Sequence, residues 1–191
     1  RPDITAAALD YVLSGCKQAE KPLLIYPSPR GRSLDQAYVR ELSQGSGVVI
    51  LCGRYEGLDQ RVIEHYQLTE VSIGDYILSG GEQAAMVILD CVVRLLPGVM
   101  GKQIGNQQES FEMSLLEHDH FTQPRHWQDM DVPEVLYSGH HQQIEAWRRQ
   151  NAEMITKQRR PDLWDNYIKQ SAGKNTVKKH SKSSDKARDN H

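Results

Sequence analysis

The sequence predicts an α/β fold with a parallel sheet. Three short apolar runs, at residues 23–26, 48–52 and 70–73, alternate with segments of helical periodicity. Strands that alternate with helices at this spacing are joined by crossover connections and therefore run parallel. Ligands bind to such sheets beyond the carboxyl ends of the strands. The loops that follow the three runs are the first candidates for a functional site.

Composition limits the classes of protein to consider. The 191 residues are 38% hydrophobic and 25% charged, which is typical of a globular chain of one domain or one and a half. We expect no membrane partner and a cytoplasmic location, because no apolar run reaches the roughly 18 residues of a membrane span and no secretory signal is recognised. Cys16, Cys52 and Cys91 form no C-x-x-C pair, so buried free thiols are favoured over disulfides or a zinc site.

The charge is unevenly distributed. Residues 1–140 hold 11 Lys and Arg against 19 Asp and Glu, a net charge of -8, whereas residues 141–191 hold 12 against 6, a net charge of +6. A basic C-terminal part predicts either a polyanionic partner or a solvated, unstructured end. On charge alone, both interpretations stay open.

The first elements are placed by apolar periodicity and by helix caps. A helix is expected over residues 4–13, followed by a buried strand at residues 23–26 that Pro27 ends. Ser33 and Gln36 have the spacing of a capping box, which predicts the start of the next helix. A strand followed by a helix begins a parallel crossover unit.

The second strand, at residues 48–52, is continuously apolar, as is typical of a central strand in a parallel sheet. A helix over residues 58–66 and a third strand at residues 70–73 follow it. The next helix, over residues 82–96, is apolar nearly all round. Such a helix is expected to be buried on most sides, under the sheet or in a subunit interface.

Residues 71–81 alternate short apolar pieces with glycines, which let a ligand approach the main chain closely. Ser79 and Glu82 have capping-box spacing, so a helix start lies beside the glycine pair. Together with the loops at residues 28–31 and 53–57, this stretch would line one crevice at the strand ends. The phosphate motifs of dinucleotide sites and P-loops are absent from the sequence. A small molecule of another class is therefore expected.

Beyond this helix, residues 99–134 have little periodicity, and a connection of this length is usually functional or disordered. His118 and His120 lack a third ligand at metal-site spacing, so we interpret them as surface histidines. A basic helical region begins near Ile144, and residues 171–191 have the composition of a disordered tail.

Several ordered motifs lie between residues 1 and 165. They are SPRG (28–31), LCGRYEGLDQRV (51–62), EVSIGDYILSGGE (70–82), VRLLPGV (93–99), VPEVLYSGHH (132–141), IEAWRR (144–149) and RRPDL (159–163). In this order they closely resemble the bacterial tRNA (guanine-N1)-methyltransferase family of the SPOUT superfamily. The motifs are long and specific, so a chance match is not a serious alternative.

The resemblance implies a SPOUT-type parallel sheet with a deep trefoil knot, followed by a small helical C-terminal domain. Its domains would be a knotted cofactor-binding domain at 1–98, a linker at 99–134, a helical tRNA-binding domain at 135–170 and a disordered basic tail at 171–191. The implied cofactor is S-adenosyl-L-methionine in a bent conformation, with adenine read by backbone groups around Ile73, Tyr76 and Leu78. The residues carried over as its binding site are Pro29, Gly53, Tyr55, Glu56, Ser72, Ile73, Gly74, Asp75, Tyr76, Ile77, Leu78, Gly80 and Gly81.

The resemblance also implies the catalytic groups. N1 of guanine carries a proton and is a poor nucleophile until that proton leaves, so a general base is the main requirement. Glu109 occupies the position of the family's catalytic carboxylate, which is Asp in several members. Arg94 matches an arginine that stabilises negative charge developing on guanine O6. The alternative for Arg94 is a simple ion pair with Asp90, four residues earlier.

The implied substrate is N1 of guanosine 37 in tRNA, next to the anticodon, where methylation supports reading-frame maintenance. The implied assembly is a homodimer with its active site at the subunit interface, and the linker becomes ordered when tRNA binds. Arginines near Trp147 would clamp the anticodon arm by phosphate contacts and stacking. Magnesium is compatible with tRNA handling or with a place near Glu56, but no ligand cluster demands it, and no metal site is predicted.

Some features depart from the family pattern. Family members carry a first strand and a glycine-rich loop ahead of the position of Arg1, so a non-catalytic RNA-binding module is the alternative if this truncation is real. An enzyme for another nucleotide is disfavoured by the missing phosphate motifs. Asp129 stands where a glycine is usual, and His140 where an asparagine is usual.

Overall fold

The computed structural model describes residues 1–16, 21–54, 57–99, 110–111 and 114–172. The chain divides into two compact units, Arg1–Gln103 and Ile104–His191. Each unit is described by itself. The predicted domain limits at residues 98, 134 and 170 stay predictions.

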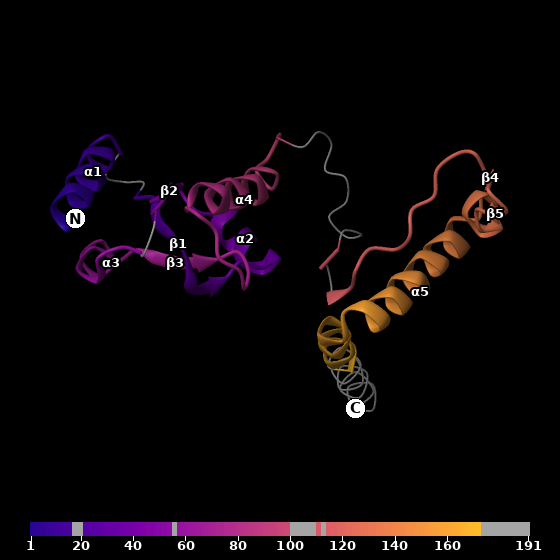
Figure 1. Cartoon of the computed structure of the whole chain (residues 1–191). Coiled ribbons are helices and arrows are strands. Elements are labelled where there is room, and N and C mark those ends of the chain that lie inside the picture. Colours follow the sequence, from indigo (N-terminus) through magenta and orange to yellow (C-terminus); the bar gives the residue numbers. More distant parts are fainter. Residues whose placement is uncertain (17–20, 55–56, 100–109, 112–113, 173–191) are drawn as a thin grey trace, which may run out of the picture. The chain divides into compact units, whose positions relative to one another are not determined.

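The first unit contains a three-stranded parallel sheet, as predicted (Figure 1). Its strands are β1 (Leu23–Ser33), β2 (Val48–Ile50) and β3 (Thr69–Ser72), in the spatial order β2-β1-β3. Both pairings of β1 are parallel. The first unit is thus a mixed α/β structure built on parallel strands.

The strand β1 does not end at Pro27, which corrects the predicted strand at residues 23–26. It continues to Ser33, and its pairing with β3 shifts register between Pro27 and Arg32, both of which pair with Val71. Proline cannot donate to the ladder, but it is accepted in a strand at such an irregularity. The extra residues, 28–31, bulge out of the ladder.

The central strand among the described residues is β1, not the apolar run at 48–52. All three residues of β2 are half-buried at one edge, whereas Ile25 in β1 is fully buried. An apolar strand can be buried by helices as well as by other strands. Its composition therefore does not distinguish an edge strand from a central one.

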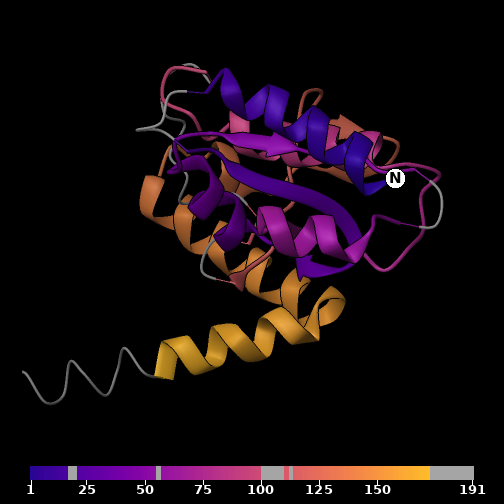
Figure 2. The same ribbon diagram turned by 90° about the vertical axis from the view of Figure 1, so that its left-hand side faces the viewer.

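Helices cover both faces of the sheet. On one face, α2 (Gln36–Ser43) and α4 (Glu82–Val93) form an apolar cluster with Ile25 and Val71. On the other face, α1 (Pro2–Ser14) and α3 (Gln60–Tyr66) pack around Tyr26. Figure 2 views the unit from the side of α1 and α3, which lie over the strands. Neighbouring residues of β1 therefore supply two separate cores, as the alternation of side chains in a strand requires.

The helix starts differ from the predicted capping boxes. Asp35, not Ser33, caps α2 by accepting a hydrogen bond from the Tyr38 N–H (2.8 Å). Ser33 cannot act as the cap because it is still paired with Ser72 in the sheet. At α4 the N-cap is Gly81, with no side-chain cap.

Within the described part of a single chain, the helix α4 is buried on one face only, and its predicted burial in a subunit interface stays a prediction. Ala84, Ala85, Ile88 and Val92 are buried against the first unit. The opposite face exposes Met86, Val87, Leu89 and Val93, with Met86 70% exposed. Apolar side chains thus lie on both faces of α4, but the described part of a single chain buries only one of these faces.

The second unit contains a short antiparallel hairpin, β4 (His126–Trp127) and β5 (Met130–Asp131). Its turn residues Gln128 and Asp129 both have left-handed φ angles, +48° and +60°. Two such residues are typical of the tight turns that favour Asn, Asp or Gly. The Asp129 that departs from the family pattern is therefore compatible with this turn.

The main element of the second unit is α5 (His141–Arg159), preceded by the 3-10 helix η2 (Glu134–Tyr137); residues 161–172 are helical as well. Thr156 of α5 is fully buried and accepts a hydrogen bond from the Leu116 N–H (2.8 Å). Asn151 accepts one from the Asp119 N–H (2.7 Å) and donates to the Asp119 carboxylate (3.0 Å). The segment around residues 116–119 is therefore held on α5.

None of the helices in the described parts of the chain is both long and apolar enough to cross a membrane. The three cysteines are all free, as predicted, but Cys52 is exposed and Cys16 and Cys91 are half-buried. The prediction that they are buried was wrong.

Candidate functional site

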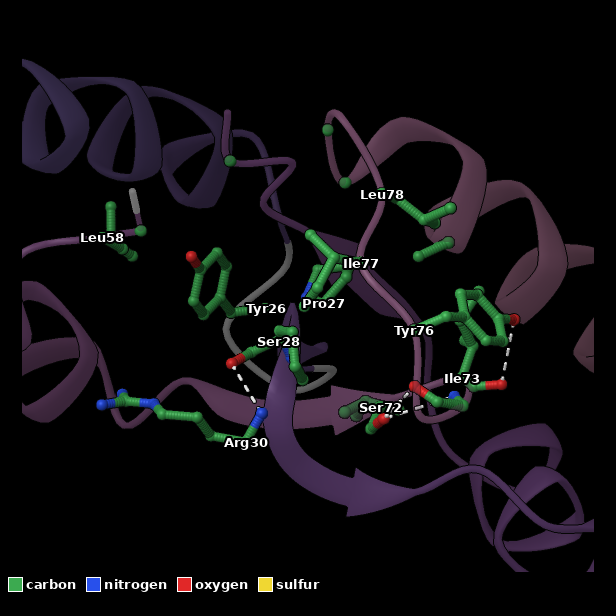
Figure 3. A pocket seen from close by; sticks show the side chains of 18 of the residues that line it. Tyr26, Pro27, Ser28, Arg30, Leu58, Ser72, Ile73, Tyr76, Ile77 and Leu78 are labelled. Carbon is green, nitrogen blue, oxygen red and sulfur yellow. Dashed lines mark hydrogen bonds between the residues drawn. The ribbon is translucent and has the colours of Figure 1, made fainter. Parts of the chain in front are cut away.

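A cavity of about 450 Å³ lies beside β1 and β3 in the first unit (Figure 3). This volume is in the range of sites for small organic ligands. Four segments of the chain contribute lining residues: residues 26–30 of β1; residues 53, 57, 58 and 60 after β2; residues 71–74 at the end of β3; and residues 76–81 and 84, which lead into and begin α4. Residues far apart in the sequence thus meet at one site.

The cavity brings together most of the residues predicted to bind the cofactor. Those that line it are Pro29, Gly53, Ser72, Ile73, Gly74, Tyr76, Ile77, Leu78, Gly80 and Gly81. Asp75 is not among the lining residues, and Tyr55 and Glu56 lie outside the described residues. The position of these residues is observed, whereas their binding role stays a prediction.

Five further lining residues belong to the loops predicted to form the crevice, although no binding role was assigned to them. They are Ser28, Arg30, Gly57, Val71 and Ser79. The sequence analysis missed five others, which are Tyr26, Pro27, Leu58, Gln60 and Ala84. Tyr26 gave no signal, because it looks like an ordinary strand residue.

Two glycines shape the wall of the cavity by close approach. A Cβ atom on Gly53 would lie 3.0 Å from the Tyr26 ring, and one on Gly81 would lie 3.2 Å from Cys52 Cα. The Gly81 N–H donates to the Gly53 carbonyl (2.9 Å), and Arg54 forms an isolated antiparallel bridge with Gly80. Residues 80–81 and 53–54 therefore pack main chain against main chain.

Short-range hydrogen bonds hold the loops in place. Ser28 Oγ accepts from the Arg30 N–H (3.3 Å), and Ser72 Oγ accepts from the Gly74 N–H (3.3 Å). The Tyr76 hydroxyl donates to the Ile73 carbonyl (3.3 Å). Figure 3 shows these bonds along the lower wall of the cavity. Ser28 and Ser72 are both buried. Their side chains therefore hold the two loops in place through hydrogen bonds inside the protein.

An ion pair links the loop after β2 to the start of α4. Arg54 Nε donates to Glu82 Oε1 (2.9 Å). The Glu82 backbone N–H and then the Arg54 guanidinium hold the pKa of Glu82 below its usual range. Burial, and then the Glu82 charge, raise the pKa of the Cys52 thiol. The raised pKa of Cys52 disfavours its thiolate, the form in which a cysteine acts as a nucleophile.

The two residues predicted to be catalytic are not brought to the cavity by the described chain. Glu109 lies outside the described residues. Arg94 is exposed at the C-terminal end of α4, where its backbone N–H donates to the Asp90 carbonyl (3.2 Å), and it does not line the cavity. Both interpretations of Arg94, catalytic group and partner of Asp90, therefore stay open.

The described part of the chain holds no group of three or more His, Cys, Asp and Glu side chains placed to bind a metal ion. The rings of His118 and His120 lie 4.8 Å apart between centroids and are tilted by 49°, and His120 Nε2 lies 3.0 Å from Glu117 Oε1. The cavity itself is lined by apolar side chains, glycines, serine hydroxyls, Arg30 and Gln60.

Comparison with known proteins gives a consistent result. The family model for tRNA (Guanine-1)-methyltransferase TrmD matches residues 1–166. The tRNA (guanine-N(1)-)-methyltransferase of Rhodospirillum rubrum is 55% identical over 168 residues, which are 88% of this chain and 68% of the relative. The enzyme of the same name from Brucella ovis is 54% identical over 169 residues, again 88% of this chain and 68% of the relative.

Proposed function

The chain belongs to the tRNA (guanine-1)-methyltransferase family, and we propose that it transfers a methyl group from S-adenosyl-L-methionine to N1 of guanosine 37 in tRNA. The observation that carries this proposal is the cavity, which lies on the motifs shared with the family. The alternative of a non-catalytic RNA-binding module would leave this cavity without a role.

The cavity fits the proposed cofactor in size and chemistry. Its volume of about 450 Å³ suits a nucleoside with an amino-acid chain. The closely packed glycines of the wall leave main chain accessible to an adenine ring. In the proposal, this ring is read by peptide N–H and C=O groups around Ile73, Tyr76 and Leu78. When bound, S-adenosyl-L-methionine supplies a methyl group already activated by its sulfonium.

The protein's own contribution to the chemistry is removal of a proton. In the proposal, the Glu109 carboxylate accepts the proton from guanine N1, and the Arg94 guanidinium stabilises the negative charge that then develops on O6. Binding both reactants to one protein aligns the nucleophile with the methyl group. Magnesium stays compatible with this scheme, which does not demand it.

A homodimer is part of the proposal. The exposed face of α4 carries Met86, Val87, Leu89 and Val93, and contiguous exposed apolar side chains are typical of protein interfaces. Because Arg94 ends this same helix and does not line the cavity of its own chain, it would act on the site across the subunit interface. Glu109 would reach the same site as the linker becomes ordered with tRNA.

The trefoil knot is proposed for the first unit. The main-chain contact of residues 53–54 with residues 80–81 supports it, since glycines are needed where two segments cross closely. The second unit is proposed to bind the anticodon arm through the basic face of α5 and the residues that follow, where Arg148, Arg149, Arg159 and Arg160 lie. A cytoplasmic location accords with the three free thiols.

Two measurements on the protein test the proposal. Calorimetry should detect S-adenosyl-L-methionine binding, and transcripts of tRNA with guanosine at position 37 should gain a methyl group at N1. The Glu109→Gln variant should keep cofactor affinity but lose about 100-fold or more in methyl transfer, because an amide cannot accept the proton. Wild-type turnover in that variant would remove Glu109 from the mechanism, and failure of the unaltered protein to bind the cofactor would reject the function.

A further inference from the structure

The three tryptophans of the second unit differ in how much of each ring is free. Trp127 in β4 is 57% exposed, whereas Trp147 and Trp164 are half-buried. The Trp147 ring packs among other rings, with its centroid 6.0 Å from that of Phe121 and 6.4 Å from that of His118. Stacking on RNA was expected near Trp147, but Trp127 offers more free ring surface to a ligand.

The hairpin that carries Trp127 has two different faces. Trp127 pairs with Met130, and His126 pairs with Asp131. Residues directly opposite each other in an antiparallel pair point to the same face, and successive residues point to opposite faces. One face therefore carries Trp127 and Met130. The other carries His126 and Asp131, whose Nδ1 and Oδ1 atoms lie 2.9 Å apart.

Arg125 continues the tryptophan face and joins it to Tyr137. The Val132 N–H donates to the Arg125 carbonyl (2.9 Å), which extends the pairing of the hairpin by one step. Arg125 lies two residues before Trp127 and so points to the same face. Arg125 Cζ lies 4.2 Å from the centroid of the Tyr137 ring, within the range of a cation–π contact.

We call this surface the hairpin platform. It consists of Arg125, Trp127, Met130 and Tyr137. All four side chains are exposed, with Met130 at 58% and Tyr137 at 43%. Together they present an indole, a phenol ring and a guanidinium plane on one side of the second unit.

The chemistry of the platform fits a nucleobase. Unpaired bases of RNA stack on aromatic rings and on the planes of arginine side chains. The charge of Arg125 is complementary to the phosphates that flank a base. Asp129 at the turn and Asp131 on the opposite face add negative charge nearby, so stacking is the main contribution expected of the platform.

The size of the platform disfavours a protein partner. A stable protein–protein interface buries roughly 800 Å² on each partner. Four side chains that are only partly exposed offer far less than this area. One stacked base needs no more than a ring face and its surroundings.

We propose that the hairpin platform stacks an unpaired nucleotide of the substrate tRNA, with the base lying on the ring of Trp127. The inference rests on the proposed function, since it takes tRNA as the ligand. Every base has a π face, so stacking tolerates any base at this position. The platform would therefore strengthen tRNA binding without specifying the sequence.

The test compares two substitutions of Trp127. The affinity of the whole chain for a labelled tRNA transcript would be measured by fluorescence anisotropy. Trp127→Phe keeps an aromatic ring and should weaken binding by less than about threefold. Trp127→Leu keeps apolar surface but has no ring face, and should weaken binding about tenfold.

The matched control is Tyr11→Leu, which also replaces an exposed ring by leucine. Tyr11 lies in α1 of the first unit and is 81% exposed. This variant should bind tRNA within about twofold of the unaltered protein, as is usual for a surface substitution away from a site.

Further measurements separate stacking from charge and from a structural role. Arg125→Met should weaken tRNA binding about threefold and reduce its dependence on salt. The loss in Trp127→Leu should be the same at low and at high salt, because stacking is not screened by ions. Its melting temperature should stay within a few degrees, given the exposure of Trp127, and its affinity for S-adenosyl-L-methionine should not change.

The outcomes are distinct. A loss in Trp127→Leu, with binding kept in Trp127→Phe and Tyr11→Leu, supports the proposal. Full tRNA affinity in Trp127→Leu, or equal losses in the leucine and phenylalanine variants, overturns it and leaves the methyltransferase function intact. A changed oligomeric state of Trp127→Leu in sedimentation would assign the platform to a protein contact and overturn it as well. Failure of the unaltered protein to bind tRNA would overturn the inference and the proposed function together.

Discussion

The cavity of the first unit and the helix α5 of the second are built in opposite ways. The cavity is lined by four segments of main chain and side chains, which glycines and a register shift in β1 bring close together. The helix α5 makes its contacts through polar side chains, such as the bonds from Thr156 and Asn151 to residues 116 and 119. Main-chain sites tolerate few changes of shape, whereas side-chain networks can be weakened one bond at a time.

The same contrast extends to charge. The Arg149 guanidinium donates to the Glu153 carboxylate (3.1 Å) and to the Tyr167 hydroxyl (3.0 Å), and Tyr167 in turn donates to Glu153 (2.5 Å). The Tyr167 hydroxyl, and then Glu153, raise the pKa of Arg149. The second unit thus has a connected polar network where the first has a nearly uncharged cavity. Sequence changes should act differently in the two units.

The largest effect is expected for Gly31→Ala in the first unit. An alanine Cβ would lie 2.3 Å from Glu70 C and Val71 N, which are main-chain atoms that cannot rotate away. Forcing the strands apart should lower the free energy of unfolding by about 3 kcal/mol and abolish ligand binding. Urea denaturation measures the first effect and calorimetry the second.

Gly45→Ala is the matched control for this change. A Cβ at this position would make an ordinary contact at 3.4 Å with the Leu42 carbonyl oxygen. Its stability should stay within about 1 kcal/mol of the unaltered protein. If both variants were equally stable, the close approach of β1 and β3 would not be a constraint.

Arg94→Ala tests whether a side chain of the first unit contributes to the chemistry. In the proposed mechanism this change should reduce methyl transfer about 100-fold, because charge on guanine O6 loses its stabilising cation. The melting temperature should hardly change, since Arg94 is exposed at the end of α4. A large drop in melting temperature with a retained rate would instead favour the ion pair with Asp90.

Thr156→Val tests the side-chain network of the second unit. The hydroxyl accepts from the Leu116 N–H and donates to the Ala152 carbonyl (2.7 Å), and the residue is fully buried. Valine keeps the shape but leaves the Leu116 N–H unsatisfied, which should cost about 2 kcal/mol. Thr156→Ser keeps both bonds and should cost only about 1 kcal/mol, for one buried methyl group. Equal losses would show that packing, not hydrogen bonding, holds this segment.

The smallest effects are expected for the exposed ion pairs at helix starts, one in each unit. The Arg61 side chain, and then its backbone N–H, lower the pKa of Asp59 to about 2, and Arg160 lowers that of Asp162. A lowered pKa means that stability from each carboxylate is present above its ordinary pKa near 3.8 and is lost as the pH falls through the folded value. Asp59 should therefore lose its contribution as the pH falls from about 4 to about 2.

Carboxyl chemical shifts, followed by NMR from pH 1 to 6, would measure both groups. Arg61→Met should move the Asp59 titration upward toward pH 3.8 and leave Asp162 unchanged. An unchanged Asp59 titration in that variant would show that the pair is not formed in solution.

Much of the candidate site could be predicted from the sequence. The loops 28–31, 53–57 and 71–81 were identified as parts of one crevice, and the cavity lies among them. What the sequence did not reveal is the path of β1 beyond Pro27. The bulge that carries Arg30 exists because two residues of β1 pair with the same Val71, and this register depends on a strand about forty residues away.

The capping predictions failed for a similar reason. Both predicted capping boxes have the correct spacing, Ser33 with Gln36 and Ser79 with Glu82. In neither of them does the serine cap the helix. Ser33 is paired in the sheet, and Ser79 lies two residues before Gly81, the N-cap of α4. A cap motif is a local preference of about 1 kcal/mol, which tertiary contacts can override.

The sequence by itself determined the alternation of strands and helices, the parallel sheet, the glycine-bearing loops and the family. These follow from local periodicity, from turn residues and from long ordered motifs, all of which are properties of neighbouring residues. Only the tertiary structure decided which strand is central, which face of α4 is covered, and that Arg30 is the charged residue of the cavity wall among those described. The physical reason is that burial and register depend on contacts between distant segments, which local sequence patterns do not encode.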